Sequence, residues 1–439
     1  MFRAHGWRHL LGLLALLALA TPVLAQEQSH PVWQITVEGP LTPALVAYVE
    51  RSLDLAEAED VEVLILTLNT PGGRLDWMQQ IVADLRASPV PVVVYVAPRG
   101  ASAASAGTLV TLAGHAAAMA PETTIGAASP VDALGGDLDE TAERKIKEDV
   151  RALARGLTER RGAAATRLAE AMIEDARAVS ATEALAAGLI DFIAADREDL
   201  LRQLDGFVVE VAGRPVTLST AGASVRSIEM TWIERVLTRI VDPNLLALLL
   251  FIGLQALLIE LGSPGGWVAG FIGVVCLALA IYGLGVLPVD WFGLVLIATA
   301  FGLFVLDIKA PTHGALTVVG VLTLIAGLLV LFSSPGVAPF GQLSLALVVA
   351  LGAGTGLFFL FIVAKGLHAQ RAPPVTGLET LLGATGVART DLAPAGFVFV
   401  HGERWQAVAD QGMIEQGAPV RVVGIEGLRL TVRREPDGA

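Results

Sequence analysis

The chain has few charged residues and only one cysteine. Charged residues make up 17% of its 439 residues, and the cysteine, Cys276, lies within an apolar run. A single cysteine excludes a disulfide framework within the chain, and its apolar setting argues against redox chemistry. The net charge of -13 argues against nucleic acid as the principal partner. The sequence contains no Walker A or metal-binding motif, so we expect neither a nucleotide nor a metal cofactor.

Side chains that could act as a base near neutral pH are also scarce. Between the N-terminal apolar segment and the central apolar region, the only histidines are His30 and His115. His115 opens an apolar stretch, which favours a structural role. The chain has four lysines, and two of them, Lys145 and Lys147, lie in the same region. Because arginine keeps its proton in proteins, these two lysines are the candidate bases.

The N-terminus has the pattern of a secretory signal peptide. Arg3 and Arg8 form a basic start, residues 10–19 are apolar, and small residues precede the expected cleavage site. We predict a signal peptide over residues 1–25, cleaved after Ala25. The segment that follows is therefore expected outside the cytoplasm.

Apolar strands alternate with helical segments in the next part of the chain. Residues 61–68 and 90–96 have the pattern of buried strands, and residues 75–85 between them have helical spacing. This alternation predicts parallel βαβ units with helices on both faces of the sheet. We predict an α/β domain over residues 30–220, followed by a linker over residues 221–242.

Two turns of small residues follow strands of the predicted sheet. One contains Gly72 and Gly73, and the other has the sequence Gly-Ala-Ser-Ala-Ala-Ser-Ala-Gly over residues 100–107. A strand that turns sharply into a helix can present one side chain to a ligand, which makes Ser105 the candidate nucleophile. Acyl transfer also needs N–H donors for a developing oxyanion, and the backbones of Gly72, Gly73 and Ala106 are the candidates.

The candidate bases lie at the start of a predicted helix downstream of Ser105. Lys145 and Lys147 flank opposite sides of an apolar stripe that includes Ile146 and Val150. A lysine can act as a general base if burial lowers its pKa toward neutrality. Periodicity alone does not choose between the two lysines.

These features together resemble the NfeD-type membrane serine peptidases, relatives of the ClpP and signal peptide peptidase A group. The resemblance rests on the motif Asn-Thr-Pro-Gly-Gly over residues 69–73, the serine turn, the motif Ile-Gly-Ala-Ala-Ser-Pro over residues 125–130 and the lysine-opened helix. It implies a ClpP/crotonase-like fold and a Ser-Lys dyad. Within that dyad it selects Ser105 over Ser102.

The resemblance also selects Lys145 over Lys147 as the base, and it assigns the oxyanion donors to Gly72, Gly73 and Ala106. The segment over residues 130–140, rich in glycine and aspartate, resembles an active-site loop of this family. The dyad is then assembled when that loop is ordered.

The central region has the composition of a membrane domain. Five apolar runs cover residues 245–261, 267–287, 292–308, 316–332 and 343–363. Each is near the length of a membrane span, so we predict about five transmembrane helices over residues 243–366. With the first domain exported, an odd number of spans places the C-terminus in the cytoplasm and the protein in the cell (inner) membrane. Glycine-rich spans permit close helix packing, which favours a homo-oligomer, a dimer or higher.

Five short β-rich runs between glycine turns occupy the C-terminal region. This pattern predicts a small OB-type barrel over residues 377–435, which is also the C-terminal domain that the resemblance implies. Because acids and bases are balanced and aromatic residues are few, a protein-interaction role is favoured over nucleic-acid binding.

The leading hypothesis is a membrane-anchored, ATP-independent serine endopeptidase. The resemblance suggests stomatin-like membrane proteins as substrates or partners, cleaved in apolar segments. The alternative is a catalytically silent scaffold or regulator of stomatin-like proteins. A crotonase-type acyl-thioester enzyme would share the fold, but the predicted export and the Ser-Lys pairing argue against it.

Overall fold

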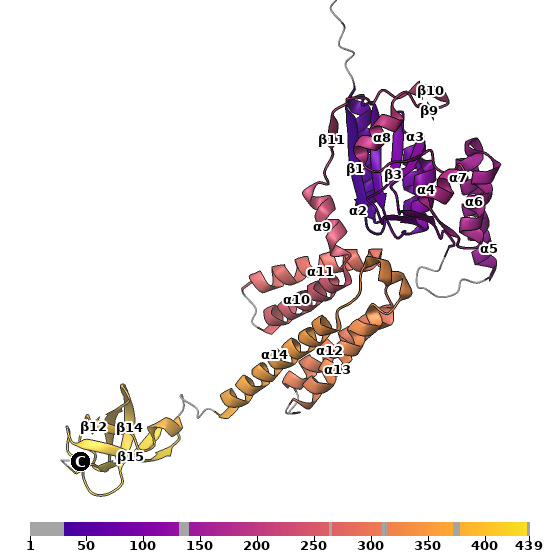
Figure 1. The fold of residues 1–439 in the computed structure, drawn as a ribbon. Helices are drawn as coiled ribbons and strands as arrows, with labels where there is room; N and C mark the ends of the chain where they lie inside the picture. The colour runs from indigo at the N-terminus through magenta and orange to yellow at the C-terminus, as the bar shows by residue number, and fades with distance from the viewer. Residues whose placement is uncertain are drawn as a thin grey trace, which may run out of the picture. The chain divides into compact units, whose positions relative to one another are not determined.

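The structure is a computed structural model that describes residues 30–130, 140–262, 266–309, 312, 314–371 and 378–436 (Figure 1). The predicted signal peptide and residues 131–139 of the predicted active-site loop lie outside the described residues. The chain forms two compact units, residues 1–357 and residues 358–439, and each is described by itself.

The first unit begins with an α/β domain built on a six-stranded sheet (Figure 1). The strand order is β11-β1-β2-β3-β5-β8, and all neighbouring strands are parallel. The strands are β1 (Val32–Glu38), β2 (Val63–Asn69), β3 (Val92–Val96), β5 (Ala116–Met119), β8 (Phe192–Ile193) and β11 (Val225–Ser227). The predicted parallel α/β architecture is therefore confirmed.

Both faces of this sheet are covered, as its apolar strands require. Leu64 and Leu66 of β2 belong to one buried cluster, and Val63 and Ile65 belong to another on the opposite face. The helices of the domain are α2 (Pro43–Ala58), α3 (Leu75–Ala87), α4 (Ala106–Ala113), α5 (Glu140–Thr158), α6 (Ala163–Glu174), α7 (Ala181–Ala186) and α8 (Arg197–Leu204). The antiparallel hairpin of β9 (Val208–Val211) and β10 (Arg214–Thr217) packs with α8 on the second face.

A second, three-stranded sheet carries the serine turn. Its order is β4-β6-β7, formed by β4 (Ser102–Ala104), β6 (Thr124–Gly126) and β7 (Ala178–Ser180). The pair β4 and β6 is parallel, and the pair β6 and β7 is antiparallel. Only Ser105 separates the end of β4 from the start of α4.

Residues 221–242, predicted to be a linker, contain two elements of secondary structure. Strand β11 joins the edge of the main sheet, where Val225 pairs with Val32. Helix α9 (Trp232–Ile240) follows, and its capping box joins Thr231 and Glu234. The polar composition of this segment predicted a linker. The strand was missed because strand pairing at a sheet edge depends on residues distant in the sequence.

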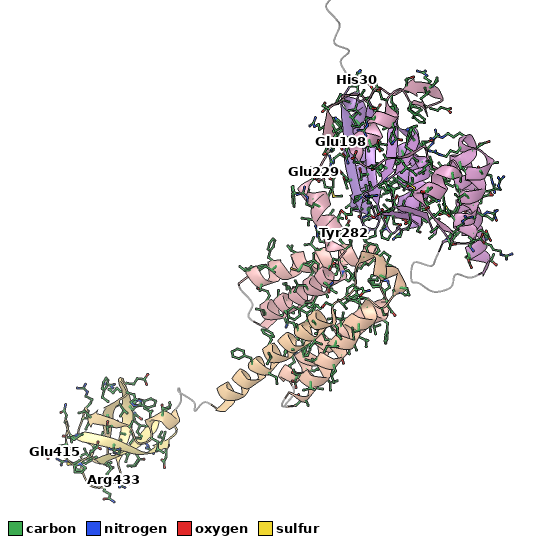
Figure 2. The ribbon with its side chains drawn as sticks, viewed as in Figure 1. His30, Glu198, Glu229, Tyr282, Glu415 and Arg433 are labelled. Atoms are coloured by element: carbon green, nitrogen blue, oxygen red, sulfur yellow. The ribbon has the colours of Figure 1, made fainter. Side chains whose placement is uncertain are left out.

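Five long helices form the central region: α10 (Pro243–Gly262), α11 (Val268–Val286), α12 (Trp291–Lys309), α13 (Ala315–Leu331) and α14 (Leu345–Arg371). In α10 and α11, apolar stretches of 19 residues are long enough to cross a membrane by length and composition. The other three helices carry shorter apolar stretches. The side chains of α10 to α14 that Figure 2 draws consist almost entirely of carbon. Nitrogen and oxygen atoms are frequent on the α/β domain and the C-terminal barrel.

Two helical hairpins in this region share one construction. A methyl group added at Gly273 of α11 would lie 3.1 Å from the carbonyl oxygen of Gly253 in α10. A methyl group added at Gly327 of α13 would lie 3.0 Å from the carbonyl oxygen of Gly293 in α12. In each hairpin, glycine therefore allows two helix backbones to approach closely.

The carboxylates near the ends of α10 and α12 cap the helices that follow. Glu260 accepts hydrogen bonds from the backbone N–H groups of Trp267 and Gly270, each over 3.2 Å. Asp307 accepts a hydrogen bond from the N–H of Thr317 over 3.2 Å. These contacts give both acidic residues a structural role at helix termini.

The second unit contains a closed barrel of five strands in the order β12-β13-β14-β16-β15. The strands are β12 (Thr385–Ala388), β13 (Ala395–Val400), β14 (Glu403–Ala409), β15 (Pro419–Glu426) and β16 (Arg429–Arg434). The predicted small OB-like barrel is confirmed. Its closure depends on the parallel pairing of β14 with β16.

Candidate active site

Ser105 occupies an unusual backbone conformation between β4 and α4. Its φ and ψ angles are 53° and -119°, in a region that residues other than glycine rarely adopt. Its side chain is half-buried. Backbone strain of this kind persists only where the surrounding structure holds it, and it is frequent at active sites.

Two threonines and a glycine hold the serine turn in place. The N–H of Ser105 donates to the carbonyl of Gly126 over 2.9 Å. The buried Thr108 hydroxyl lies 3.0 Å from the carbonyl of Ala103, 3.1 Å from the carbonyl of Gly126 and 3.1 Å from the N–H of Gly126, which donates to it. Thr70 N–H and carbonyl bond the backbone of β4. The turn is thus fixed from both neighbouring strands.

The supporting roles of these residues were not predicted from the sequence. Asn69 also belongs to the group, because its side-chain oxygen accepts the N–H of Ser102 over 3.1 Å. Asn69 and Thr70 lie within the Asn-Thr-Pro-Gly-Gly motif, so the motif itself was the available signal. The roles of Thr108 and Gly126 depend on contacts between segments distant in the sequence.

The glycine turn lies directly against the candidate nucleophile. A methyl group added at Gly72 would lie 2.8 Å from Cβ and 3.2 Å from Oγ of Ser105. Gly72 has a φ of 126°, which residues other than glycine rarely adopt. The structure therefore brings the two predicted turns together, although they are separated in the sequence by α3 and β3.

The backbone donors in this turn differ in their availability. The N–H of Gly72 donates to the Thr70 hydroxyl over 3.0 Å. The N–H of the exposed Gly73 has no hydrogen-bond partner among the described residues. Ala106 is the first residue of α4, and the first N–H groups of a helix lack acceptors within it. Gly73 and Ala106 can thus offer N–H donors beside Ser105.

The two candidate lysines lie on α5 in different surroundings. The side chain of Lys147 is 22% exposed, and its Nζ lies 3.2 Å from Oε1 of Glu143. Lys145 is exposed and has no ion-pair partner among the described residues. Neither lysine forms a hydrogen bond with Ser105 in the described part of the chain. The structure therefore brings the serine turn and the glycine turn together, but it shows no hydrogen bond between a described lysine and the serine.

The surroundings of His115 favour a structural role over proton transfer. Its side chain is buried, and its Nδ1 accepts the backbone N–H of Val92 over 3.0 Å. Burial, with the nearby charges of Arg86 and Arg160, lowers the pKa of His115 to about 4. The imidazole is therefore neutral near pH 7, and its Nδ1 already accepts a hydrogen bond from the sheet. The predicted structural role of His115 agrees with this geometry.

A serine on a strained turn with adjacent backbone donors can support acyl transfer. The hydroxyl would attack a carbonyl, and the N–H groups at the start of α4 and in the glycine turn would stabilise the oxyanion. No group of three or more histidine, cysteine, aspartate or glutamate side chains could hold a metal ion within the described residues.

Three family models match successive parts of the chain. Residues 31–210 match the NfeD1b N-terminal domain, and residues 244–365 match the NfeD integral membrane domain. Residues 378–434 match the NfeD-like C-terminal, partner-binding domain.

The chain is similar along its whole length to the membrane-bound protease PH1510 of Pyrococcus horikoshii. The two sequences are 36% identical over 440 aligned positions, which cover 98% of each chain. Among solved structures, a membrane protease from the same organism, specific for a stomatin homolog, is 31% identical with a TM-score of 0.42. That alignment covers 48% of this chain and 98% of the protease domain. ClpP1 from Listeria monocytogenes is 20% identical, with a TM-score of 0.32 and coverage of 38% and 94%.

Proposed function

The chain belongs to the NfeD family, and we propose that it is a membrane-anchored serine endopeptidase that uses a Ser-Lys dyad. It is an integral membrane protein, as its NfeD membrane domain and its full-length relative indicate. That relative is a membrane-bound protease, which supports peptidase activity in this chain.

The contact between Gly72 and Ser105 is the observation that carries the proposal. Gly72 packs against the strained Ser105, and the residue that follows each of them, Gly73 and Ala106, supports the proposal with a backbone N–H. A peptide carbonyl bound there would have its carbon near Oγ and its oxygen near the two donors. We assign the oxyanion site to Gly73 and Ala106, with Gly72 providing the close approach, because the N–H of Gly72 already donates to Thr70.

We assign the general base to Lys145. The ammonium group of Lys147 is engaged by Glu143, whereas Lys145 lies two residues earlier without an ion-pair partner among the described residues. Nζ of a neutral Lys145 takes the proton from Oγ of Ser105 as Oγ attacks the peptide carbonyl. The resulting ammonium group gives that proton to the leaving amine. Water then hydrolyses the acyl-enzyme and releases the serine.

The proposed substrates and partners are stomatin-like membrane proteins, cleaved within apolar segments. Support comes from the solved relative, which is a protease specific for a stomatin homolog, and from the match of the barrel to a partner-binding domain. We place the α/β domain outside the cytoplasm and the barrel inside, with five spans between them. The lipid bilayer surrounds these helices, and their glycine-rich composition, which permits close helix packing, supports a homo-oligomer.

The test uses the full-length protein in liposomes with a peptide from the apolar segment of a stomatin-like protein. Ser105→Ala and Lys145→Ala are each expected to abolish cleavage, whereas Lys147→Ala retains it. Retained cleavage in Ser105→Ala contradicts the nucleophile. Loss in Lys147→Ala with retention in Lys145→Ala reassigns the base to Lys147.

A catalytically silent scaffold for stomatin-like proteins is the second candidate. It is favoured by the exposure of Lys145, which forms no hydrogen bond with Ser105 among the described residues, and by the partner-binding match of the barrel. A full-length protein that binds a stomatin-like protein but leaves it and its apolar peptides uncleaved would support the scaffold.

A further inference from the structure

Helix α9 lies directly before the first membrane helix. It spans Trp232–Ile240, and α10 begins at Pro243. It also contacts α10 and α11. A helix in this position must enter or lie beside the lipid–water boundary once α10 crosses the bilayer.

One side of α9 is apolar and exposed. Trp232, Ile233 and Val236 have exposed fractions of 72%, 51% and 43%. At 3.6 residues per turn, these side chains share one face, and that face also includes the buried Ile240. Within the described α/β domain and α9, nothing covers the three exposed side chains.

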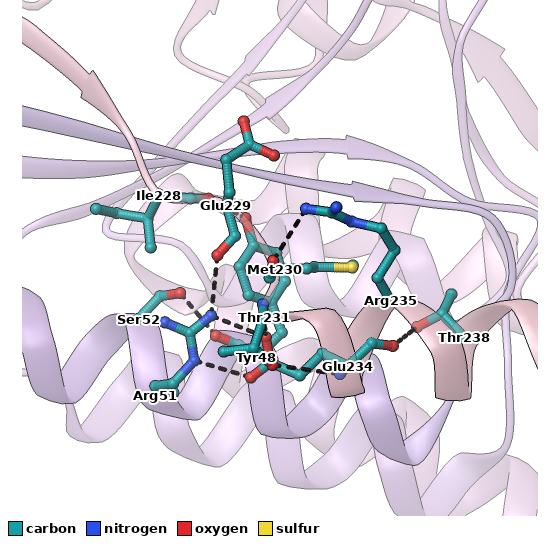
Figure 3. A network of polar contacts seen from close by, with 10 residues as sticks. All are labelled: Tyr48, Arg51, Ser52, Ile228, Glu229, Met230, Thr231, Glu234, Arg235 and Thr238. Carbon is teal, nitrogen blue, oxygen red and sulfur yellow. Dashed lines mark hydrogen bonds and ion pairs between the residues drawn. The ribbon is translucent and has the colours of Figure 1, made fainter.

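The opposite side of α9 is fixed to the α/β domain (Figure 3). The Arg51 guanidinium of α2 donates two hydrogen bonds to the Glu234 carboxylate, each over 2.8 Å, and a third to the carbonyl of Glu229 over 3.1 Å. The Tyr48 hydroxyl donates to the carbonyl of Ile228 over 2.5 Å. We call this group the α2–α9 clamp. It determines which side of α9 faces away from the α/β domain.

Two arginines lie beside the apolar face. Arg235 and Arg239 are exposed and follow Trp232 by three and seven residues, which places them along its edge. Arg235 also donates to the carbonyl of Met230. Tryptophan is enriched at the lipid–water boundary, and long basic side chains there reach the lipid phosphates.

We propose that α9 is an interfacial helix that binds the lipid surface. Trp232, Ile233 and Val236 insert at the boundary between head groups and acyl chains, and Arg235 and Arg239 contact lipid phosphates. Continuity with α10 favours lipid over a second copy of the chain as the occupant of this face. Because the α2–α9 clamp holds the other side, the α/β domain is kept at the bilayer surface. This inference depends on membrane anchoring and not on the proposed peptidase activity.

The test places a nitroxide spin label on α9 in the full-length protein, in a Cys276→Ala background. Labels are attached through Val236→Cys and, as a matched control, through Val208→Cys on β9, where the native valine is 53% exposed. The protein is reconstituted in liposomes of phosphatidylcholine and phosphatidylglycerol. Collision of the label with oxygen, which concentrates in lipid, is compared with collision with a water-soluble nickel chelate.

The expected result is a ratio of oxygen to nickel accessibility that is several-fold higher at position 236 than at position 208. Equal ratios would overturn the proposal. Low accessibility to both reagents, with spin–spin broadening that disappears on dilution with unlabelled protein, would assign the face to a second copy and also overturn it. Arg235→Gln combined with Arg239→Gln is expected to lower the ratio at position 236.

Discussion

The N–H of Leu41 donates to the carbonyl of Gly72 over 2.8 Å, which joins the residue before the α2 N-cap to the glycine turn. Gly73 packs against the same leucine, because a methyl group added at Gly73 would lie 2.6 Å from its Cβ. The turn is therefore held by Leu41 on one side and faces Ser105 on the other. It has no room for a side chain at either glycine.

Gly72→Ala is expected to abolish cleavage while most of the fold remains. The new methyl group would meet Ser105 Cβ at 2.8 Å, and alanine at a φ of 126° adds strain. We expect a loss of about 1–3 kcal/mol in stability and a fall in kcat of about 10²-fold or more. Activity and thermal unfolding of the purified protein measure the two effects.

Gly162→Ala is the matched control for backbone strain. Gly162 has a φ of 91°, and a methyl group there would meet no atom within 4 Å. Its stability should fall while its cleavage rate is retained. Equal loss of cleavage in both variants would show that strain, and not the contact with Ser105, explains the effect at Gly72.

Thr108→Val is expected to impair catalysis through the position of Ser105. The substitution removes the hydroxyl that bonds Ala103 and Gly126 and leaves the Gly126 N–H without that acceptor. We expect a cost of about 1–3 kcal/mol, with kcat reduced more than KM is changed. Thr111→Val is the control, because its buried hydroxyl donates within α4 to the carbonyl of Gly107. If the two variants lower kcat equally, Thr108 has no specific positioning role.

The α/β domain is expected to lose stability as the pH falls below 6.5. The pKa of His115 is about 4 in the folded chain and 6.5 in the unfolded chain. As the pH falls, the unfolded chain therefore takes up this proton before the folded chain does. The stabilisation is complete above pH 6.5 and is lost progressively toward pH 4, a change of about 3 kcal/mol. Hydrogen exchange at β3, corrected for intrinsic rates, measures it. His115→Gln should flatten this dependence, and an unchanged pH profile would contradict the assignment.

The α2–α9 clamp is expected to weaken in acid. Hydrogen bonding from Arg51 holds the pKa of Glu234 below its ordinary value of 4.5. The stabilisation is therefore present above pH 4.5 and is lost as the pH falls through the lower folded pKa. Because the pair is partly exposed, we expect a coupling of about 1–2 kcal/mol.

A double-mutant cycle with Arg51→Met and Glu234→Gln, read by hydrogen exchange of α9, measures that coupling. A coupling near zero would show that the clamp does not stabilise α9. Arg74→Met with Asp76→Asn provides an exposed ion pair for comparison, and its coupling should be smaller.

Local patterns in the sequence were sufficient to predict the architecture of the domains. The apolar run of β2 predicted a strand buried on both faces, and the five apolar runs coincide with α10 to α14. Such patterns depend on the period of a helix or strand, which neighbouring residues determine. The serine and glycine turns were recognisable because each needs small residues within a few positions.

Tertiary structure decided the relations between distant segments. It placed Gly72 against Ser105, gave the N–H of Gly72 to Thr70 and left that of Gly73 available. It also joined the expected linker to α2 through Arg51 and Glu234. No local period encodes these contacts, because their partners meet only after the parallel sheet has formed. The sequence thus determined which residues could form the candidate site, and the folded chain decided which backbone groups of that site are free to act.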